Sequence, residues 1–238
     1  MVMNMKKLIV DYRISKTEET SLLKLGYDLL ACPSSYKLYY AICGHPDIQI
    51  HIIDKKNIIV HKDMSPKFIE DLKKLNINVI TSESSLSSKY PQDIILNAVN
   101  FSNYFIHYLN YTDKNLLSLI KLSNKKLINT KQGYTKCSTA IVNNNSIITS
   151  DKNIAKSLQK ENIDILLLPP GDIILPGLNY GFIGGACGLI EKNVLAFYGS
   201  LECYAYGKEV LSFLKKHKVE PIFLSEGKLI DRGSILKL

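Results

Sequence analysis

A pattern of strand, hairpin, strand, helix and strand recurs along this sequence and constrains its fold more than any other feature. In the clearest copy, isoleucines alternate over residues 48–53 and predict a strand, polar residues 54–57 predict a turn, and residues 58–60 predict the returning strand. A helix with Pro66 at its first position then leads to a third strand at 77–80. The returning strands begin near Leu8, Ile58, Phe105, Ile147 and Val194. A spacing of roughly 42–50 residues is typical of a propeller or another repeat array.

The repeats divide the chain into five units. They span residues 1–43 together with 227–238, then 44–90, 91–130, 131–180 and 181–226. The first unit lacks an opening strand, and the chain ends with a spare one. Pairing of this last strand with residues 7–10 would complete the first unit and leave no exposed sheet edge. We therefore predict a single α/β domain, a five-fold pseudo-symmetric α/β-propeller of ββαβ repeats closed by its C-terminal strand. The alternative is a layered α/β sheet with a loose C-terminal strand, although layered sheets contain few hairpins.

Composition limits the classes of protein to which the chain can belong. Of its 238 residues, 46% are hydrophobic, and no apolar run is long enough to span a membrane. The first ten residues lack the long apolar stretch of a signal peptide, so we expect a cytoplasmic protein. The five cysteines are odd in number and form no Cys-x-x-Cys pair, which argues against a disulfide framework or a zinc site. The net charge of +8 comes with no nucleic-acid motif. The sequence indicates no cofactor and leaves the oligomeric state open.

The densest glycine cluster lies at residues 181–188, with the sequence GFIGGACG. It places Cys187 just after Gly184 and Gly185, on a backbone that can approach its neighbours closely. A dinucleotide-binding loop would follow a strand and open a helix. Here Pro176 and Gly177 precede the cluster and a strand follows it, which argues against that interpretation.

The repeat pattern, with the segments Gln132-Gly133-Tyr134, Leu175-Pro176-Gly177 and Gly181 to Gly185, resembles the guanidino-modifying enzyme fold. This fold, also called the pentein, is a five-bladed α/β-propeller. It includes arginine and agmatine deiminases, dimethylarginine hydrolases and amidinotransferases, together with a ribosome anti-association factor that is not an enzyme. The chain looks like an uncharacterised bacterial branch of this fold.

The resemblance implies a site in the central channel. In the catalytic members a cysteine attacks the guanidinium carbon, a histidine moves protons and carboxylates hold the cation. By this resemblance Cys187 is the expected nucleophile and His45 the expected acid and base. The expected substrate-binding residues are Asp47, Asp11, Arg13, Asp231, Gly184 and Gly185. In a closed ring, the starts of the opening strands would gather Asp47, Cys137, Cys187 and Ser234 near one axis, with Asp231 behind them.

Two alternatives stay open from the sequence. Cys137 competes with Cys187 as the reactive thiol, because the adjacent Lys136 could lower its pKa. The second alternative concerns the function. The chain is a cysteine-dependent enzyme, namely a hydrolase, deiminase or amidinotransferase that acts on a guanidino or amidino compound, or it is a non-catalytic protein that binds a small ligand, a protein or RNA.

Overall fold

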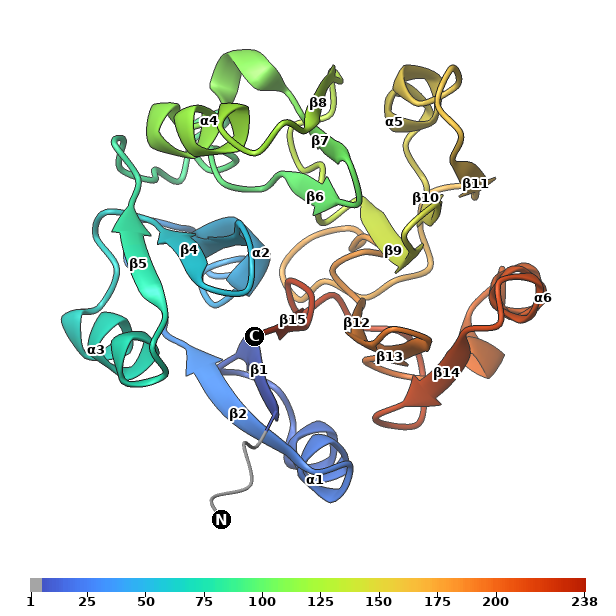
Figure 1. Ribbon diagram of the computed structural model, residues 1–238. Helices are drawn as coiled ribbons and strands as arrows, with labels where there is room; N and C mark the ends of the chain where they lie inside the picture. The colour runs from blue at the N-terminus through green and yellow to red at the C-terminus, as the bar shows by residue number, and fades with distance from the viewer. Residues whose placement is uncertain (1–5) are drawn as a thin grey trace.

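A computed structural model describes residues 6–238, which form five three-stranded sheets arranged around a common centre (Figure 1). The strands are β1 (Lys6–Asp11), β2 (Tyr27–Cys32), β3 (Ile50–Ile52), β4 (Asn57–Val60), β5 (Asn78–Thr81), β6 (Val99–Phe101), β7 (Tyr104–His107), β8 (Lys126–Asn129), β9 (Thr139–Asn143), β10 (Ser146–Thr149), β11 (Asp164–Leu167), β12 (Cys187–Glu191), β13 (Val194–Phe197), β14 (Glu220–Phe223) and β15 (Leu236–Lys237). The helices are α1 (Lys16–Lys24), α2 (Pro46–Gln49), α3 (Pro66–Lys74), α4 (Lys114–Lys121), α5 (Lys152–Ser157) and α6 (Gly207–Lys216), with short 3₁₀ turns at Leu109–Tyr111 and Leu201–Cys203.

The same pairing scheme occurs in every sheet. The sheet orders are β15-β1-β2, β3-β4-β5, β6-β7-β8, β9-β10-β11 and β12-β13-β14. In each, the first two strands pair antiparallel and the last two pair parallel across a helix. The predicted arrangement of five ββαβ units is therefore confirmed.

The C-terminal strand completes the first unit, as the sequence predicted. Strand β15 pairs antiparallel with β1, with Leu8 opposite Lys237 and Ile9 opposite Leu236. Glu191 in the neighbouring sheet accepts hydrogen bonds from Lys237 (2.7 Å) and Lys6 (2.5 Å). These contacts anchor both ends of the described chain to the fifth unit.

Two opening strands are shorter than predicted. Residues 46–49 form the short helix α2, so the strand expected at 48–53 begins only at Ile50. In the third unit the apolar run at 94–99 also predicts an opening strand, and this prediction is wrong, because β6 covers only Val99–Phe101 and the preceding residues form turns. Ile94 and Leu96 are fully buried in these turns. Hydrophobic patterning reports such burial but does not distinguish a buried turn from a strand.

The local signals at helix ends are reproduced. Ser15 and Glu18, which have the three-residue spacing of a capping box in the sequence, form one at the start of α1. Pro66 occupies the first turn of α3. Helices α1, α3, α4, α5 and α6 lie on the outside of the molecule, whereas the buried helix α2 and the opening strands lie toward its centre (Figure 1).

Hydrophobic cores lie between neighbouring units, because each sheet buries both of its faces. On β1, Leu8 and Val10 pack with Ile190 of the fifth unit, whereas Ile9 packs with Ile50 of the second. Strands buried on both faces read as continuous apolar runs rather than as alternating ones. None of the helices formed by residues 6–238 is long and apolar enough to cross a membrane.

Candidate functional site

A buried polar cluster forms where the opening strands begin. The Ser234 hydroxyl lies 2.7 Å from Asp47 Oδ2 and 2.6 Å from the carbonyl oxygen of Gly184. Lys136 Nζ donates to Ser234 Oγ at 2.8 Å. The backbone of Ser234 has φ +71°, a left-handed conformation that costs energy for any residue with a side chain and that recurs at functional sites. The second, fourth, fifth and first units thus meet at one hydroxyl group.

The glycine loop is packed too closely for side chains. A Cβ atom at Gly184 would overlap the carbonyl oxygens of Lys136 and Thr139, and one at Gly185 would overlap the carboxylate of Asp231. Glycine is required at both positions because the obstacle at Gly184 is backbone and the obstacle at Gly185 is a fully buried side chain.

Asp231 connects the glycine loop to the end of the chain. Its Oδ2 accepts a hydrogen bond from Phe182 N (2.8 Å) and its Oδ1 accepts one from Gly233 N (3.0 Å). His45 Nδ1 lies 3.8 Å from Oδ1, and both side chains are buried. Burial raises the pKa of Asp231 above its ordinary value, and His45 opposes this shift. His45 and Asp231, which the sequence analysis named for separate roles, therefore lie side by side.

The thiol of Cys187 is buried and protonated. It donates a hydrogen bond to the carbonyl oxygen of Ile183 at 3.2 Å. Burial raises its pKa to about 12, although the charge of Lys136 acts in the opposite direction. A thiol in this state is a poor nucleophile until a further positive charge stabilises its thiolate.

Cys137 is also buried, and its expected activation by Lys136 is wrong. Burial raises the pKa of the Cys137 thiol well above its ordinary value, and the carboxylates of Asp47 and Asp231 raise it further. The ammonium group of Lys136 binds Ser234 instead. Asn97 Nδ2 donates to Cys137 Sγ at 3.1 Å, which holds the thiol in place.

Asp11 and Arg13 form a separate buried ion pair. Arg13 Nε donates to Asp11 Oδ1 (2.9 Å) and Arg13 Nη2 donates to Asp11 Oδ2 (2.6 Å). The guanidinium group also donates to the carbonyl oxygens of Tyr40 and Ala41. Among residues 6–238, no hydrogen bond joins this pair to the cluster around Ser234. The guanidinium group of Arg13, one of the expected substrate-binding residues, is thus already occupied by partners within the chain.

A cavity of about 380 Å³ runs along the centre of the ring. Every sheet contributes its opening strand to the lining, and Asp47, Lys136 and Cys187 lie at the end where these strands begin. Asp47 Oδ1 is buried and accepts no hydrogen bond from the part of the chain that the structure describes. A buried carboxylate oxygen without a donor is energetically costly, so this atom is a candidate acceptor for a ligand in the cavity.

Sequence reasoning missed two residues that organise this site. In the sequence Lys136 stands out only as a neighbour of Cys137, yet its side chain reaches Ser234. Asn97 donates to the carbonyl oxygen of Asp47 (2.8 Å) and accepts from the backbone of Lys136 (2.9 Å). A polar residue inside the apolar run 94–99 was the available signal for Asn97. Over residues 6–238, no group of three or more His, Cys, Asp or Glu side chains is placed to hold a metal ion.

Comparison with solved structures shows the same fold. An inosamine-phosphate amidinotransferase from Streptomyces griseus superposes with a TM-score of 0.59 at 10% identity, covering 98% of this chain and 93% of that chain. An amidinotransferase of saxitoxin biosynthesis from Microseira wollei gives a TM-score of 0.58 at 9% identity over 96% and 89% of the two chains. DDAH from Pseudomonas aeruginosa, complexed with citrulline, gives 0.57 at 9% identity over 98% and 99%.

All three are guanidino-modifying enzymes, so the predicted pentein fold is confirmed. No curated protein sequence matches this chain. A family model covers nearly all of it, matching residues 9–236. The chain therefore belongs to the family described as a family of unknown function, DUF6873.

Proposed function

We propose that this protein takes a small molecule with a guanidino or amidino group into its central channel and holds the cationic end against Asp47. One observation carries the proposal: Asp47 Oδ1 is buried at the end of the cavity and accepts no hydrogen bond from residues 6–238. A guanidinium or amidinium group supplies the missing N–H donor and binds the carboxylate through a charge-assisted hydrogen bond. The guanidino-modifying enzymes that share the fold support the same class of ligand.

For the reaction, Cys187 is the nucleophile of a hydrolase or transferase in this proposal. Its thiolate would attack the guanidinium carbon, the amine would leave with a proton, and water or a second amine would release the product. A cation bound against Asp47 would also stabilise the thiolate, so the pKa of Cys187 would be lower while the ligand is bound. His45 and Asp231 lie behind the glycine loop, where they would hold the loop and its carbonyl groups in place.

A binding protein without turnover is the second candidate, and the state of Cys187 favours it. The thiol is fully buried, donates to Ile183 O and has a pKa raised to about 12. In this case the five units form a binding scaffold, and the cysteines remain free thiols as expected in a reducing cytoplasm.

Calorimetric titration with an alkylguanidine tests the binding proposal. We expect Asp47→Asn to weaken binding by about tenfold or more, because a charge-assisted hydrogen bond is replaced by a neutral one. Asp71→Asn is the matched control, since this carboxylate lies on the surface of α3 and pairs with Lys74. Equal affinities for the wild type, Asp47→Asn and Asp71→Asn would refute the proposal.

Product release separates the two candidates. Wild-type protein and Cys187→Ala are incubated with a panel of guanidino and amidino compounds, and ammonia and urea are measured. Release that Cys187→Ala abolishes supports the hydrolase. Binding of the alkylguanidine with no release from any compound supports the binding protein.

A further inference from the structure

In every unit the hairpin turn and the end of the helix lie at the same edge of the sheet. The middle strand runs antiparallel to the opening strand and parallel to the outer strand, so the turn that precedes the middle strand and the helix end that precedes the outer strand meet there. Neighbouring units contact one another at these edges. Lys126 of the third unit pairs with Glu161 of the fourth at 2.7 Å, and Lys6 of the first unit pairs with Glu191 of the fifth at 2.5 Å. The five edges therefore form one side of the molecule.

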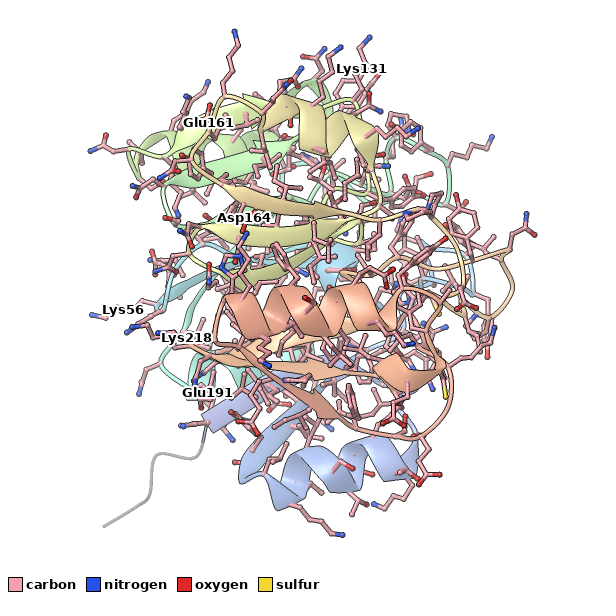
Figure 2. All side chains as sticks on the ribbon, turned by 90° about the vertical axis from the view of Figure 1, so that its right-hand side faces the viewer. Lys56, Lys131, Glu161, Asp164, Glu191 and Lys218 are labelled. Carbon is pink, nitrogen blue, oxygen red and sulfur yellow. The ribbon has the colours of Figure 1, made fainter. Side chains whose placement is uncertain are left out.

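We call this side the lysine face. In the side view Lys56, Lys218 and Glu191, which belong to it, lie toward the left-hand side of the molecule (Figure 2). The face consists of four hairpin turns, of the two segments at the edge of the first unit, and of the five segments that run from the end of a helix into an outer strand: residues 53–57, 101–104, 143–146 and 191–194; 6–7 and 237–238; and 20–28, 70–79, 117–127, 153–165 and 212–221.

The lysine face carries the net charge of the protein. It contains 17 of the 30 lysine and arginine residues of the chain but only 8 of its 22 aspartate and glutamate residues. Its formal charge is therefore +9, whereas the rest of the chain carries −1, which together give the total of +8. Of these 17 lysines, 14 are exposed. A charge gathered on one side attracts an anionic surface and orients the molecule against it.

Helix ends account for only part of this excess. A lysine in the last turn of a helix, such as Lys24 of α1, complements the partial negative charge of the helix C-terminus. Lys55, Lys56 and Lys192 lie in hairpin turns instead, where no helix dipole acts on them. Glu191, next to Lys192 in the sequence, pairs with lysines of the first unit.

Two leucines are exposed on the lysine face. Leu25 and Leu122 directly follow the lysines at the ends of α1 and α4, and they are 43% and 82% exposed. Over residues 6–238, neither arginine and none of the exposed tyrosine or phenylalanine side chains lies on this face.

This composition matches an anionic bilayer better than a nucleic acid. Single-stranded nucleic acids are bound by aromatic stacking, and arginine is the residue that matches the geometry of phosphate. Clustered lysines bind anionic lipid headgroups, and exposed leucines lie at the boundary between the headgroups and the acyl chains.

We propose that the lysine face binds the surface of an anionic phospholipid bilayer, with its lysines among the headgroups and Leu25 and Leu122 at the boundary of the acyl chains. The opposite side, with the glycine loop and the cluster around Ser234, then faces away from the bilayer. This inference goes beyond the proposed function, because it depends on the outer surface and not on the ligand of the central cavity.

Vesicle flotation tests the choice of partner. The protein is mixed with vesicles made of equal parts of phosphatidylglycerol and phosphatidylcholine, or of phosphatidylcholine alone. We expect the anionic vesicles to bind at least about tenfold more tightly, and this preference to fall as the salt concentration rises. Equal binding to the two kinds of vesicle would overturn the proposal.

Two double variants with the same change of charge test the face. Lys56→Gln with Lys192→Gln removes two exposed lysines from the lysine face, whereas Lys89→Gln with Lys131→Gln removes two exposed lysines elsewhere. We expect the first pair to weaken binding to the anionic vesicles by about tenfold or more, because each lysine near the lipid surface contributes, and the second pair to have little effect. Equal losses in the two double variants would contradict a specific face.

The leucines distinguish a bilayer from another polyanion. We expect Leu122→Ser to weaken vesicle binding by about fivefold, because part of one leucine no longer leaves water. Leu178→Ser, which changes an exposed leucine outside the lysine face, should bind as the wild type does. If Leu122→Ser binds vesicles as tightly as the wild type, or if polyuridylate binds the protein more tightly than the anionic vesicles do, the assignment to a bilayer is wrong.

Discussion

Replacing Gly184 by alanine tests whether the glycine loop is confined by rigid backbone. The added Cβ would overlap the carbonyl oxygens of Lys136 and Thr139, which belong to the start of the fourth unit. Neither carbonyl can move without shifting the backbone of β9 and the ammonium group that binds Ser234. The cost therefore lies at the upper end of the range for overpacking a core, about 3 kcal/mol in the free energy of unfolding.

Gly133→Ala is the matched control for this substitution. Its Cβ would meet the ring of Tyr90, which is 52% exposed and can rotate away, and would lie 3.0 Å from Cδ1 at the end of the buried Ile94 side chain, which needs to shift by only a few tenths of an ångström. We expect this variant to lose less than about 1 kcal/mol, because alanine also reduces the conformational entropy of the unfolded chain.

Urea denaturation and thermal melting of the two variants provide the measurement. For a chain of this size about 3 kcal/mol corresponds to a fall in Tm of about 6–12 °C. The reasoning is refuted if the free energy of unfolding of Gly184→Ala lies within about 1 kcal/mol of the wild-type value, or if the two variants are equally destabilised.

Three further predictions follow from charged and reactive groups. The lysine partners Lys237 and Lys6 lower the pKa of Glu191 to about 2. The contribution of Glu191 to stability is therefore present above about pH 4.5 and is lost as the pH falls toward 2. Urea unfolding should show that Glu191→Gln lowers the free energy of unfolding by about 1 kcal/mol at pH 7 and leaves it unchanged at pH 2. Exposed Cys203 should react with an alkylating reagent long before buried Cys187, and mass spectrometry of a Cys203→Ser variant should show the fast phase missing. Arg13→Gln leaves the carboxylate of Asp11 buried and unpaired, so urea unfolding should show a loss of about 3 kcal/mol that the double variant with Asp11→Asn largely restores.

The five repeats could be predicted from the sequence because each depends on short-range information. Alternating isoleucines around the turn at 54–57, Pro66 at the start of a helix and the capping box of Ser15 and Glu18 act within a few residues. The pairing of β15 with β1 was predictable for a different reason: the repeat count left one strand missing at the start and one spare at the end.

The site could be predicted only in outline. The ring places the starts of the opening strands together, so the approach of Asp47 and Ser234 followed from the topology, although 187 residues separate them. The role of Lys136 did not follow, because its contact with Ser234 depends on a side-chain direction that no local pattern encodes.

The sequence by itself determined the number of units, their internal order and the glycine loop. Only the tertiary structure decided which charges face one another: it paired Arg13 with Asp11, directed Lys136 to Ser234, and left an oxygen of Asp47 without a donor. The physical reason is that periodicity records which residues are buried, whereas the balance of charge in a buried site depends on distances between side chains from separate units.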